Sequence, residues 1–346
     1  MACGGDSVDN SVSTSEDIMP EPTEQIETTG TTPQEGTTLT SPEIVKADKA
    51  WEQGFYGYNV LIGIIDSGAR ATHSSFSSGR MRTDLGYNFD ALVATTTDPL
   101  SGDGHGTSVA SIAIGSKASR IGVAPKAEAI PLRTCLSSCI SKFGNKQFKD
   151  AFSWAHTQGA KVINYSLYTP FGSTDMSPDE NDPLFDALVA SGTNNIVVVF
   201  AAGNNSDTSG PVQPARNVDE EHYGGNLIAV GNVIVDSETG KVTGLDPTSN
   251  HAGIAKHKYI VAPGSSKAAR HTSDTEYHYV NGTSFAAPLV AGAAAIIREA
   301  YPVLTAAQVI QILLKSADDL GDSGVDAVYG HGMLNIDKAL TLAATY

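Results

Sequence analysis

The stretch NVLIGIID, residues 59–66, is a short apolar run that ends in a single acidic residue, Asp66. Comparable runs recur at 161–167, 195–204, 226–233 and 258–264. They are rich in β-branched residues and show no alternation with polar ones, which is typical of strands buried on both faces of a parallel sheet. The sequence therefore predicts a central parallel sheet.

Helical patterns separate these runs. The segments 146–159, 182–192 and 304–317 carry apolar residues at helical spacing, and the last opens with Thr305 and Gln308 in the spacing of a capping box. A further helix is expected over 41–54, with Ser41 as N-cap and Gly54 as stop. Alternating strands and helices predict an α/β fold, a mostly parallel central sheet with helices on both faces.

The first part of the chain differs in composition. Of its 346 residues, those from 1 to 43 include nine acidic residues and no lysine or arginine, and the formal net charge is −16. The excess of negative charge argues against nucleic-acid binding through phosphates. We expect residues 1–40 to form a disordered acidic tether rich in Thr, Ser and Pro, followed by one folded domain over 41–346.

The segment VNGTSFAAPLVAG, residues 280–292, places a serine before a run of small and apolar residues. Pro288 cannot donate to the carbonyl of Ser284, so Ser284 is expected at the N-terminal end of a buried helix. Two explanations stay open at this point. Thr283 or Ser284 is an N-cap, or Ser284 is a nucleophile.

Two more polar residues lie where predicted elements begin or end: His105 at the start of a small-residue helix and Asn204 at the end of a strand. His105 lies between glycines in GDGHGTSVASIAIG, residues 102–115, and Asn204 ends the run 195–204. Asp66, His105 and Ser284 occur in one of the chain orders known for charge-oriented nucleophiles. In that chemistry His105 accepts the serine proton, Asp66 orients the imidazole, and Asn204 with the Ser284 N–H group forms an oxyanion hole.

Four motifs together resemble the subtilisin-like serine proteases, the subtilases of peptidase family S8. They are IGIIDSG (62–68), GHGTSVA (104–110), AAGN (201–204) and NGTSFAAP (281–288). The resemblance implies a subtilisin-like three-layer fold and a serine endopeptidase that forms an acyl-enzyme. It implies the triad Asp66, His105 and Ser284 and no cofactor for the chemistry.

The same resemblance suggests where a polypeptide substrate binds. The segment NYSL (164–167) is similar to the family strand that pairs with the substrate backbone, which implies a groove at Ser166, Leu167 and Tyr168. Tyr168 stands where the family usually has glycine. Ala201, Ala202 and Gly203 are expected to form one wall of the P1 pocket. Val212 or Gln213 in GPVQPA (210–215) is expected near its floor, where large aromatic P1 side chains would fit badly.

The cysteines indicate the cellular compartment in which the protein is expected. ACGGD at residues 2–6 resembles the start of a mature bacterial lipoprotein, so Cys3 is a lipidation candidate and the only expected route to a membrane. Cys135 and Cys139 are a disulfide candidate, with two reduced thiols as the alternative. We expect an extracytoplasmic protein, in the periplasm, outer membrane or cell surface of a bacterium, or secreted.

Other stretches resemble the subtilase domains of Gram-negative surface autotransporters. They are HSSFSSGR (73–80), SNHAGIAKHKYIVAPG (249–264) and VYGHGMLNIDKAL (328–340). Ser108 departs from the family, which often has a second histidine there. A monomer is expected. Structural calcium is a further implication without a locatable site. The acidic loop 173–183 could chelate calcium by composition, but a solvated acidic loop is the favoured explanation.

Two other functions remain open. An esterase or peptide ligase would use the same triad, and ester against amide turnover distinguishes it. A pseudoprotease that only binds peptides is disfavoured because no triad or oxyanion residue is missing.

Overall fold

The computed structural model describes residues 39–89, 104–117, 120–134, 145–167 and 183–346. Its centre is an eight-stranded sheet with the strand order β10-β8-β7-β6-β1-β5-β2, in which all these pairs are parallel, and β9 adds to β8 in antiparallel fashion. The strands of this sheet are β1 (Leu61–Asp66), β2 (Tyr87–Asn88), β5 (Glu128–Arg133), β6 (Val162–Tyr165), β7 (Val197–Ala201), β8 (Leu227–Val235), β9 (Val242–Leu245) and β10 (Tyr259–Pro263). The prediction of a mostly parallel sheet is confirmed.

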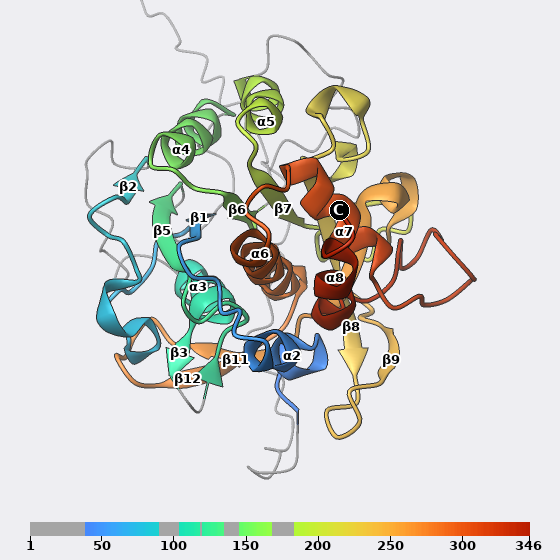
Figure 1. Ribbon diagram of the computed structural model, residues 1–346, viewed down its shortest axis with the longest axis horizontal. Coiled ribbons are helices and arrows are strands. Elements are labelled where there is room, and N and C mark those ends of the chain that lie inside the picture. The colour runs from blue at the N-terminus through green and yellow to red at the C-terminus, as the bar shows by residue number, and fades with distance from the viewer. Residues whose placement is uncertain (1–38, 90–103, 118–119, 135–144, 168–182) are drawn as a thin grey trace, which may run out of the picture.

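Helices cover both faces of the sheet, which gives three layers (Figure 1). On one face lie α3 (His105–Ile114) and α6 (Thr283–Ala300), and on the other lie α4 (Asn145–Thr157) and α5 (Pro183–Thr193). Side chains along β1 alternate between the two cores, since Ile62 and Ile64 face α3 and α6 while Ile65 packs with α4. Both faces are therefore buried, which is why the strand runs are apolar throughout.

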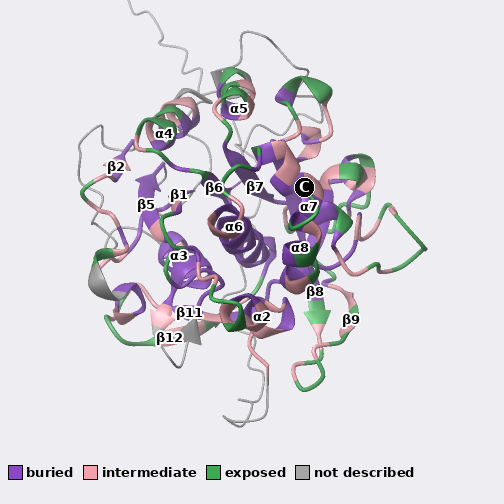
Figure 2. Ribbon diagram, viewed as in Figure 1, coloured by how far each residue is buried: buried purple, intermediate pink, exposed green. Residues whose placement is uncertain are grey.

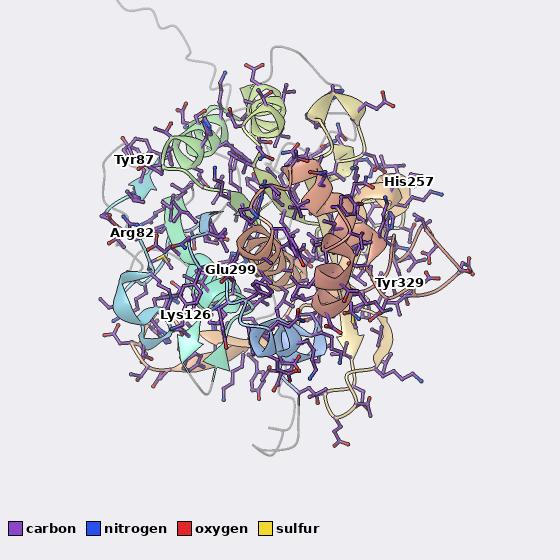
Figure 3. All side chains as sticks on the ribbon, viewed as in Figure 1. Arg82, Tyr87, Lys126, His257, Glu299 and Tyr329 are labelled. Carbon is purple, nitrogen blue, oxygen red and sulfur yellow. The ribbon has the colours of Figure 1, made fainter. Side chains whose placement is uncertain are left out.

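Helix α6 occupies the middle of the molecule and is buried along 283–298 (Figure 2). Small residues let it pack closely against the sheet and α3. At its C-terminal end, Glu299 accepts hydrogen bonds from the N–H groups of Tyr56 and Gly57 at 2.6 and 2.5 Å (Figure 3). The central helix is thus tied to the segment that leads into β1.

The start of the folded part differs from the expected helix over 41–54. Two short helices form instead, α1 (Ser41–Ile44) and α2 (Ala47–Glu52), because Lys46 between them has a left-handed backbone with φ 66°. The N-cap is Thr40, not Ser41: its N–H and hydroxyl both donate to the Glu43 carboxylate at 2.7 and 2.8 Å. The Ser41 hydroxyl donates to the Ser265 carbonyl at 2.9 Å instead.

The C-terminal helices α7 (Ala306–Lys315) and α8 (Ile336–Ala343) pack on the α6 side of the sheet. The predicted capping box of α7 is confirmed. The Gln308 N–H group donates to the Thr305 hydroxyl at 3.2 Å, and the Thr305 N–H group donates to the Gln308 side chain at 2.8 Å.

Several elements carry no clear signal in the sequence. β5 contains Pro131, which is tolerated because β2 pairs only with the next two residues of β5. The hairpin of β11 (Ser266–Ala269) and β12 (Tyr277–Val280), with the sequences SKAA and YHYV, lacks the continuous apolar run of the central strands. The pair β3 (Ser116–Lys117) and β4 (Arg120–Ile121) has only two residues in each strand. Among the described helices, none is both long and apolar enough to cross a bilayer.

Candidate active site

Asp66 and His105 meet at the carboxyl edge of the sheet. Asp66 is the last residue of β1 and is fully buried, while His105 is the first residue of α3. The His105 Nδ1 atom lies 2.8 and 3.0 Å from the two carboxylate oxygens, and the Ser67 N–H group donates to the nearer one at 2.7 Å. A carboxylate only accepts, so Nδ1 carries a proton, and in the neutral imidazole Nε2 is then the acceptor.

The glycines beside His105 permit this contact. A Cβ atom at Gly106 would lie 2.1 Å from the Gly68 carbonyl oxygen, so the two backbones touch there. A Cβ at Gly104, which has φ 79°, would fall on the His271 ring. Glycine at position 106 therefore allows the backbone at Gly68 to approach the start of α3.

Ser284 lies in the first turn of α6, and its neighbour Phe285 packs beside the His105 imidazole. The ring centroids of His105 and Phe285 are 5.1 Å apart. The residue that caps α6 is Gly282, and no side chain makes a capping hydrogen bond there. The alternative in which Thr283 or Ser284 serves as N-cap is therefore wrong. Among the described contacts, the Ser284 hydroxyl donates to the Ser166 carbonyl at 3.1 Å rather than to His105.

Ser166 also completes the first turn of α6. Pro288 has no N–H for the Ser284 carbonyl, and the Ser166 hydroxyl donates to that carbonyl at 2.8 Å. Asn164 in turn donates from Nδ2 to the Ser166 hydroxyl at 2.8 Å. Two side chains of one strand end thus replace the hydrogen bond that the proline removes.

Asn204 follows β7 and faces the start of α6. Its Oδ1 atom accepts from the N–H and the hydroxyl of Thr283 at 2.9 and 3.0 Å. With the oxygen occupied, the amide nitrogen is the free end, and it would lie 3.2 Å from a Cβ placed at Gly282. The Thr283 hydroxyl also accepts from Gly203 N–H at 3.1 Å. No sequence pattern indicated that Thr283 orients Asn204; only the capping alternative had drawn attention to this residue.

The predicted P1 wall lies beside Val212. Ala201 and Ala202 are buried, and Gly203 has φ 103°. A Cβ at Gly203 would lie 2.8 and 2.9 Å from the two methyl groups of Val212, so the Val212 side chain fills the space directly beside Gly203. Ser166 and Leu167 follow β6 directly and are largely buried. Tyr168 lies outside the described residues.

Ser108, where the family often has histidine, contacts a histidine from another element. Its hydroxyl lies 2.9 Å from Nε2 of His278 on β12 and 3.1 Å from the Ala269 carbonyl on β11. Burial lowers the pKa of His278. The β11–β12 hairpin is thereby attached to α3 one turn after His105.

A second set of contacts joins this hairpin to the segment after β1. The Arg70 guanidinium donates to the Asp274 carboxylate at 2.7 Å and to the His271 carbonyl at 2.8 Å. Arg70 and the Thr72 hydroxyl hold the pKa of Asp274 at about 2. Segments more than 200 residues apart in sequence thus frame the site together.

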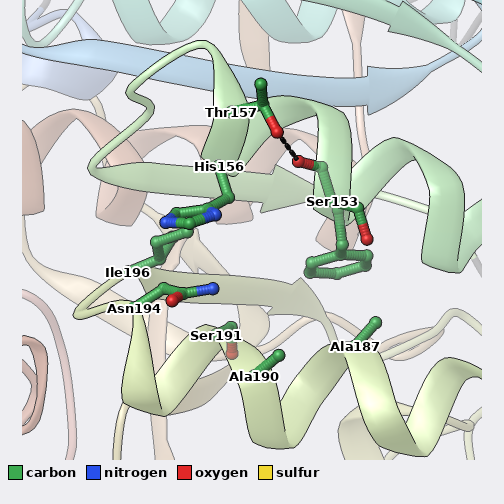
Figure 4. Close-up of a pocket in the computed structure, with 9 residues that line it drawn as sticks. Ser153, His156, Thr157, Ala187, Ala190, Ser191, Asn194 and Ile196 are labelled. Atoms are coloured by element: carbon green, nitrogen blue, oxygen red, sulfur yellow. Dashed lines mark hydrogen bonds between the residues drawn. The ribbon is translucent and has the colours of Figure 1, made fainter.

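Other sequence expectations fall outside the described residues. These are Cys3, the Cys135–Cys139 pair and residues 173–182 of the acidic loop. Within the described ranges, no group of three or more His, Cys, Asp or Glu side chains could hold a metal ion. A pocket lies between α4 and α5, lined by His156, Asn194 and Ile196 among others, and includes none of the candidate site residues (Figure 4).

Known proteins are similar to this chain in sequence. The profile of the family described as "Subtilase family" matches residues 57–332. Subtilisin DY of Bacillus licheniformis is 35% identical over 298 residues, which cover 86% of this chain and 96% of that protein.

Solved structures agree in fold. The prenylagaramide maturation protease PagA superposes with a TM-score of 0.65 at 23% identity, over 86% of this chain and 98% of that one. Fervidolysin from Fervidobacterium pennivorans gives a TM-score of 0.69 at 24% identity, over 88% of this chain and 45% of that one.

Proposed function

The chain belongs to the subtilase family and is a subtilisin-like serine endopeptidase, and we propose that it cleaves peptide bonds through Asp66, His105 and Ser284. The observation that carries this assignment of residues is the His105–Asp66 contact at 2.8 Å beside the first turn of α6. It leaves the imidazole with an accepting Nε2 on the side away from Asp66.

In the proposed reaction, the Ser284 hydroxyl turns from the Ser166 carbonyl to His105 and attacks the substrate carbonyl carbon. The Oγ–C bond forms as Nε2 takes the serine proton, and the imidazolium then gives this proton to the leaving amine as the C–N bond breaks. Water repeats the sequence on the acyl-enzyme and releases the acid. Asp66 holds the tautomer and stabilises the imidazolium. These steps use protein groups alone.

The tetrahedral oxyanion is proposed to accept from the Asn204 amide and the Ser284 N–H group. The support for Asn204 is that Thr283 binds its oxygen and so leaves its N–H₂ group to donate. Preorganised donors of this kind stabilise the transition state strongly because they need no rearrangement as charge develops.

For the substrate, we propose a polypeptide that pairs with the strand end at Ser166, Leu167 and Tyr168 and carries a small P1 side chain. Ala201, Ala202 and Gly203 would form the wall of the P1 pocket, and the contact of Val212 with Gly203 supports a shallow pocket.

We also propose an extracytoplasmic monomer, in which residues 1–40 act as a tether and Cys3 carries lipid. The supporting features are the ACGGD stretch and the acidic composition of residues 1–43. A Cys3→Ser change in the full chain should abolish incorporation of an alkynyl fatty acid in bacteria. Unchanged labelling would contradict lipidation at Cys3.

A fluorophosphonate tests the catalytic assignment. Intact-mass analysis should show one adduct, mapped to Ser284, and both Ser284→Ala and His105→Ala should abolish it. The matched control is Ser191→Ala, a buried serine of α5 that accepts a hydrogen bond from Asn226 and whose loss should leave labelling unchanged. No adduct on folded wild-type protein, or an adduct on another serine, would contradict the assignment.

A further inference from the structure

The irregular loop 202–207 carries Asn204, and a single side chain from another part of the chain holds this loop on both sides of it. That side chain is Asn250, which lies between β9 and β10 and is fully buried. Its carboxamide reaches the loop before and after Asn204, although the two asparagines are 46 positions apart in sequence.

The contacts use both ends of the amide. Asn250 donates from Nδ2 to the Ala202 carbonyl at 3.1 Å. Its Oδ1 atom accepts from the N–H groups of Asn205 and Asp207 at 2.9 and 3.1 Å. The Asn250 N–H group adds a hydrogen bond to the Gly203 carbonyl at 3.0 Å. Four hydrogen bonds from one residue thus define the backbone path on either side of Asn204.

Asn250 is itself held from the sheet. The Tyr259 hydroxyl, on β10, donates to the Asn250 carbonyl at 2.6 Å, and Tyr259 is fully buried. A Cβ at position 231 of β8 would lie 1.9 Å from that hydroxyl oxygen, so Gly231 leaves the space that the phenol needs. The support therefore runs from two sheet strands through Asn250 to the loop.

We propose that Asn250 is a positioning residue for the oxyanion hole. The inference rests on the proposed function, in which Asn204 donates to the oxyanion. Thr283 sets the direction of the Asn204 amide, and Asn250 sets the position of the backbone that bears it. Because an oxyanion donor works only at hydrogen-bond distance from the developing charge, displacement of this backbone weakens the transition state more than the ground state.

A double-mutant cycle on kcat tests the proposal. Asn250→Ala should lower kcat by about 10- to 100-fold, since misplacement of a catalytic group by about 1 Å costs up to that much. Made in an Asn204→Ala background, the same change should lower kcat by no more than about twofold, because residues that act through one another are not additive. Equal losses in both backgrounds would overturn the proposal.

Inhibitor binding provides a second measurement, one that would not change selectively if Asn250 had only a general structural role. A peptide aldehyde forms a hemiacetal with the serine, and its oxygen occupies the oxyanion position. Its affinity should fall by the same factor as kcat in Asn250→Ala, while affinity for the corresponding peptide alcohol stays within about threefold. A parallel loss of both affinities would assign Asn250 to the pocket wall or to stability instead.

The matched control is Asn226→Ala. Asn226 is also a buried asparagine that donates to a backbone carbonyl, that of Ile196, but at the opposite end of the sheet. It should lose stability without loss of kcat, and an equal loss of kcat would overturn the proposal. If Asn250→Ala does not fold, Tyr259→Phe replaces it in the cycle and must show the same non-additivity. Wild-type protein that neither labels nor cleaves peptide would refute the proposed function first, before the cycle applies.

Discussion

Ser166 binds Ser284 in both directions, donating to its carbonyl and accepting from its hydroxyl. The first of these bonds occupies an acceptor that Pro288 leaves free inside the buried start of α6. The second gives the hydroxyl of the proposed nucleophile an acceptor at the end of β6. One serine at a strand end therefore serves both the helix and the reacting group.

The helix function of Ser166 leads to a stability prediction. Ser166→Ala leaves the Ser284 carbonyl and the Asn164 amide without their partner in a buried site, which should cost about 1–3 kcal/mol in the free energy of unfolding. Urea denaturation measures this. The control Ser153→Ala, on the exposed side of α4, should change it by less than about 0.5 kcal/mol. An equally small effect at Ser166 would show that water replaces its hydroxyl.

The contact of Val212 with Gly203 leads to a prediction about specificity for the P1 side chain. Val212→Gly removes the methyl groups that contact Gly203, so a P1 phenylalanine should gain relative to a P1 alanine. Filling a pocket with a few more carbon atoms is worth at least about tenfold in the ratio of kcat/KM values. Matched peptides that differ only at P1 measure the ratio. Ile254→Ala, at an exposed nearby position, is the control, and an unchanged ratio in Val212→Gly would place the pocket elsewhere.

At the scale of elements, the two helices that carry His105 and Ser284 begin differently from the two C-terminal helices. α3 and α6 start at glycines with positive φ, 79° at Gly104 and 136° at Gly282, and neither has a side-chain cap. α7 and α8 begin with capping side chains, Thr305 and Asn335. The first N–H groups of these two helices bind neighbours at the site instead: the Gly106 N–H group donates to the Ser67 hydroxyl, and the Thr283 N–H group donates to Oδ1 of Asn204. The positive end of each helix dipole at these starts also favours developing negative charge.

This contrast predicts that a cap of α7 affects stability alone. Thr305→Ala removes the capping box and should lower the free energy of unfolding by about 1 kcal/mol. Thermal or urea denaturation checks the loss, and kcat should remain at the wild-type value. A fall in kcat at full folding would mean that α7 is coupled to the site.

At the scale of the whole molecule, the site is assembled from segments far apart in sequence. The β11–β12 hairpin bridges α3 and the segment after β1 through the Ser108–His278 and Arg70–Asp274 contacts. These contacts tie the surroundings of His105 to the chain that leads into α6. While Asp274 is ionised, we expect the hairpin to stay attached until late in unfolding. Once Asp274 is protonated and its ion pair with Arg70 is lost, we expect the hairpin to detach earlier.

A pH prediction follows from the lowered pKa of Asp274, about 2 against an ordinary 3.8. A carboxyl with a depressed pKa in the folded state contributes stability above its unfolded pKa and loses it as the pH falls through the folded value. The melting temperature should therefore fall between about pH 4 and pH 2, and less steeply in Asp274→Asn than in wild type. Asp322→Asn, in an exposed turn, controls for the loss of one negative charge. Identical slopes in wild type and Asp274→Asn would contradict this role.

The amino-acid sequence by itself determined the strand runs and the capping box of α7, and it carries the proposal that Asp66, His105, Asn204 and Ser284 act together. These features are local: an apolar run reports burial on both faces, and a strand end or helix start reports which polar groups reach the sheet edge. It failed at the start of the fold, where Thr40 rather than Ser41 caps the helix, because the Ser41 hydroxyl is taken by Ser265 from a distant segment.

Only the tertiary structure decided how the constellation is supported. Ser166 meets Ser284 across 118 positions, Asn250 meets Asn205 across 45, and Arg70 meets Asp274 across 204. No periodicity or motif relates such pairs, since each depends on which strands become neighbours and on where glycines let backbones touch. Local pattern points to the proposed reacting groups, and long-range packing determines the hydrogen bonds around them.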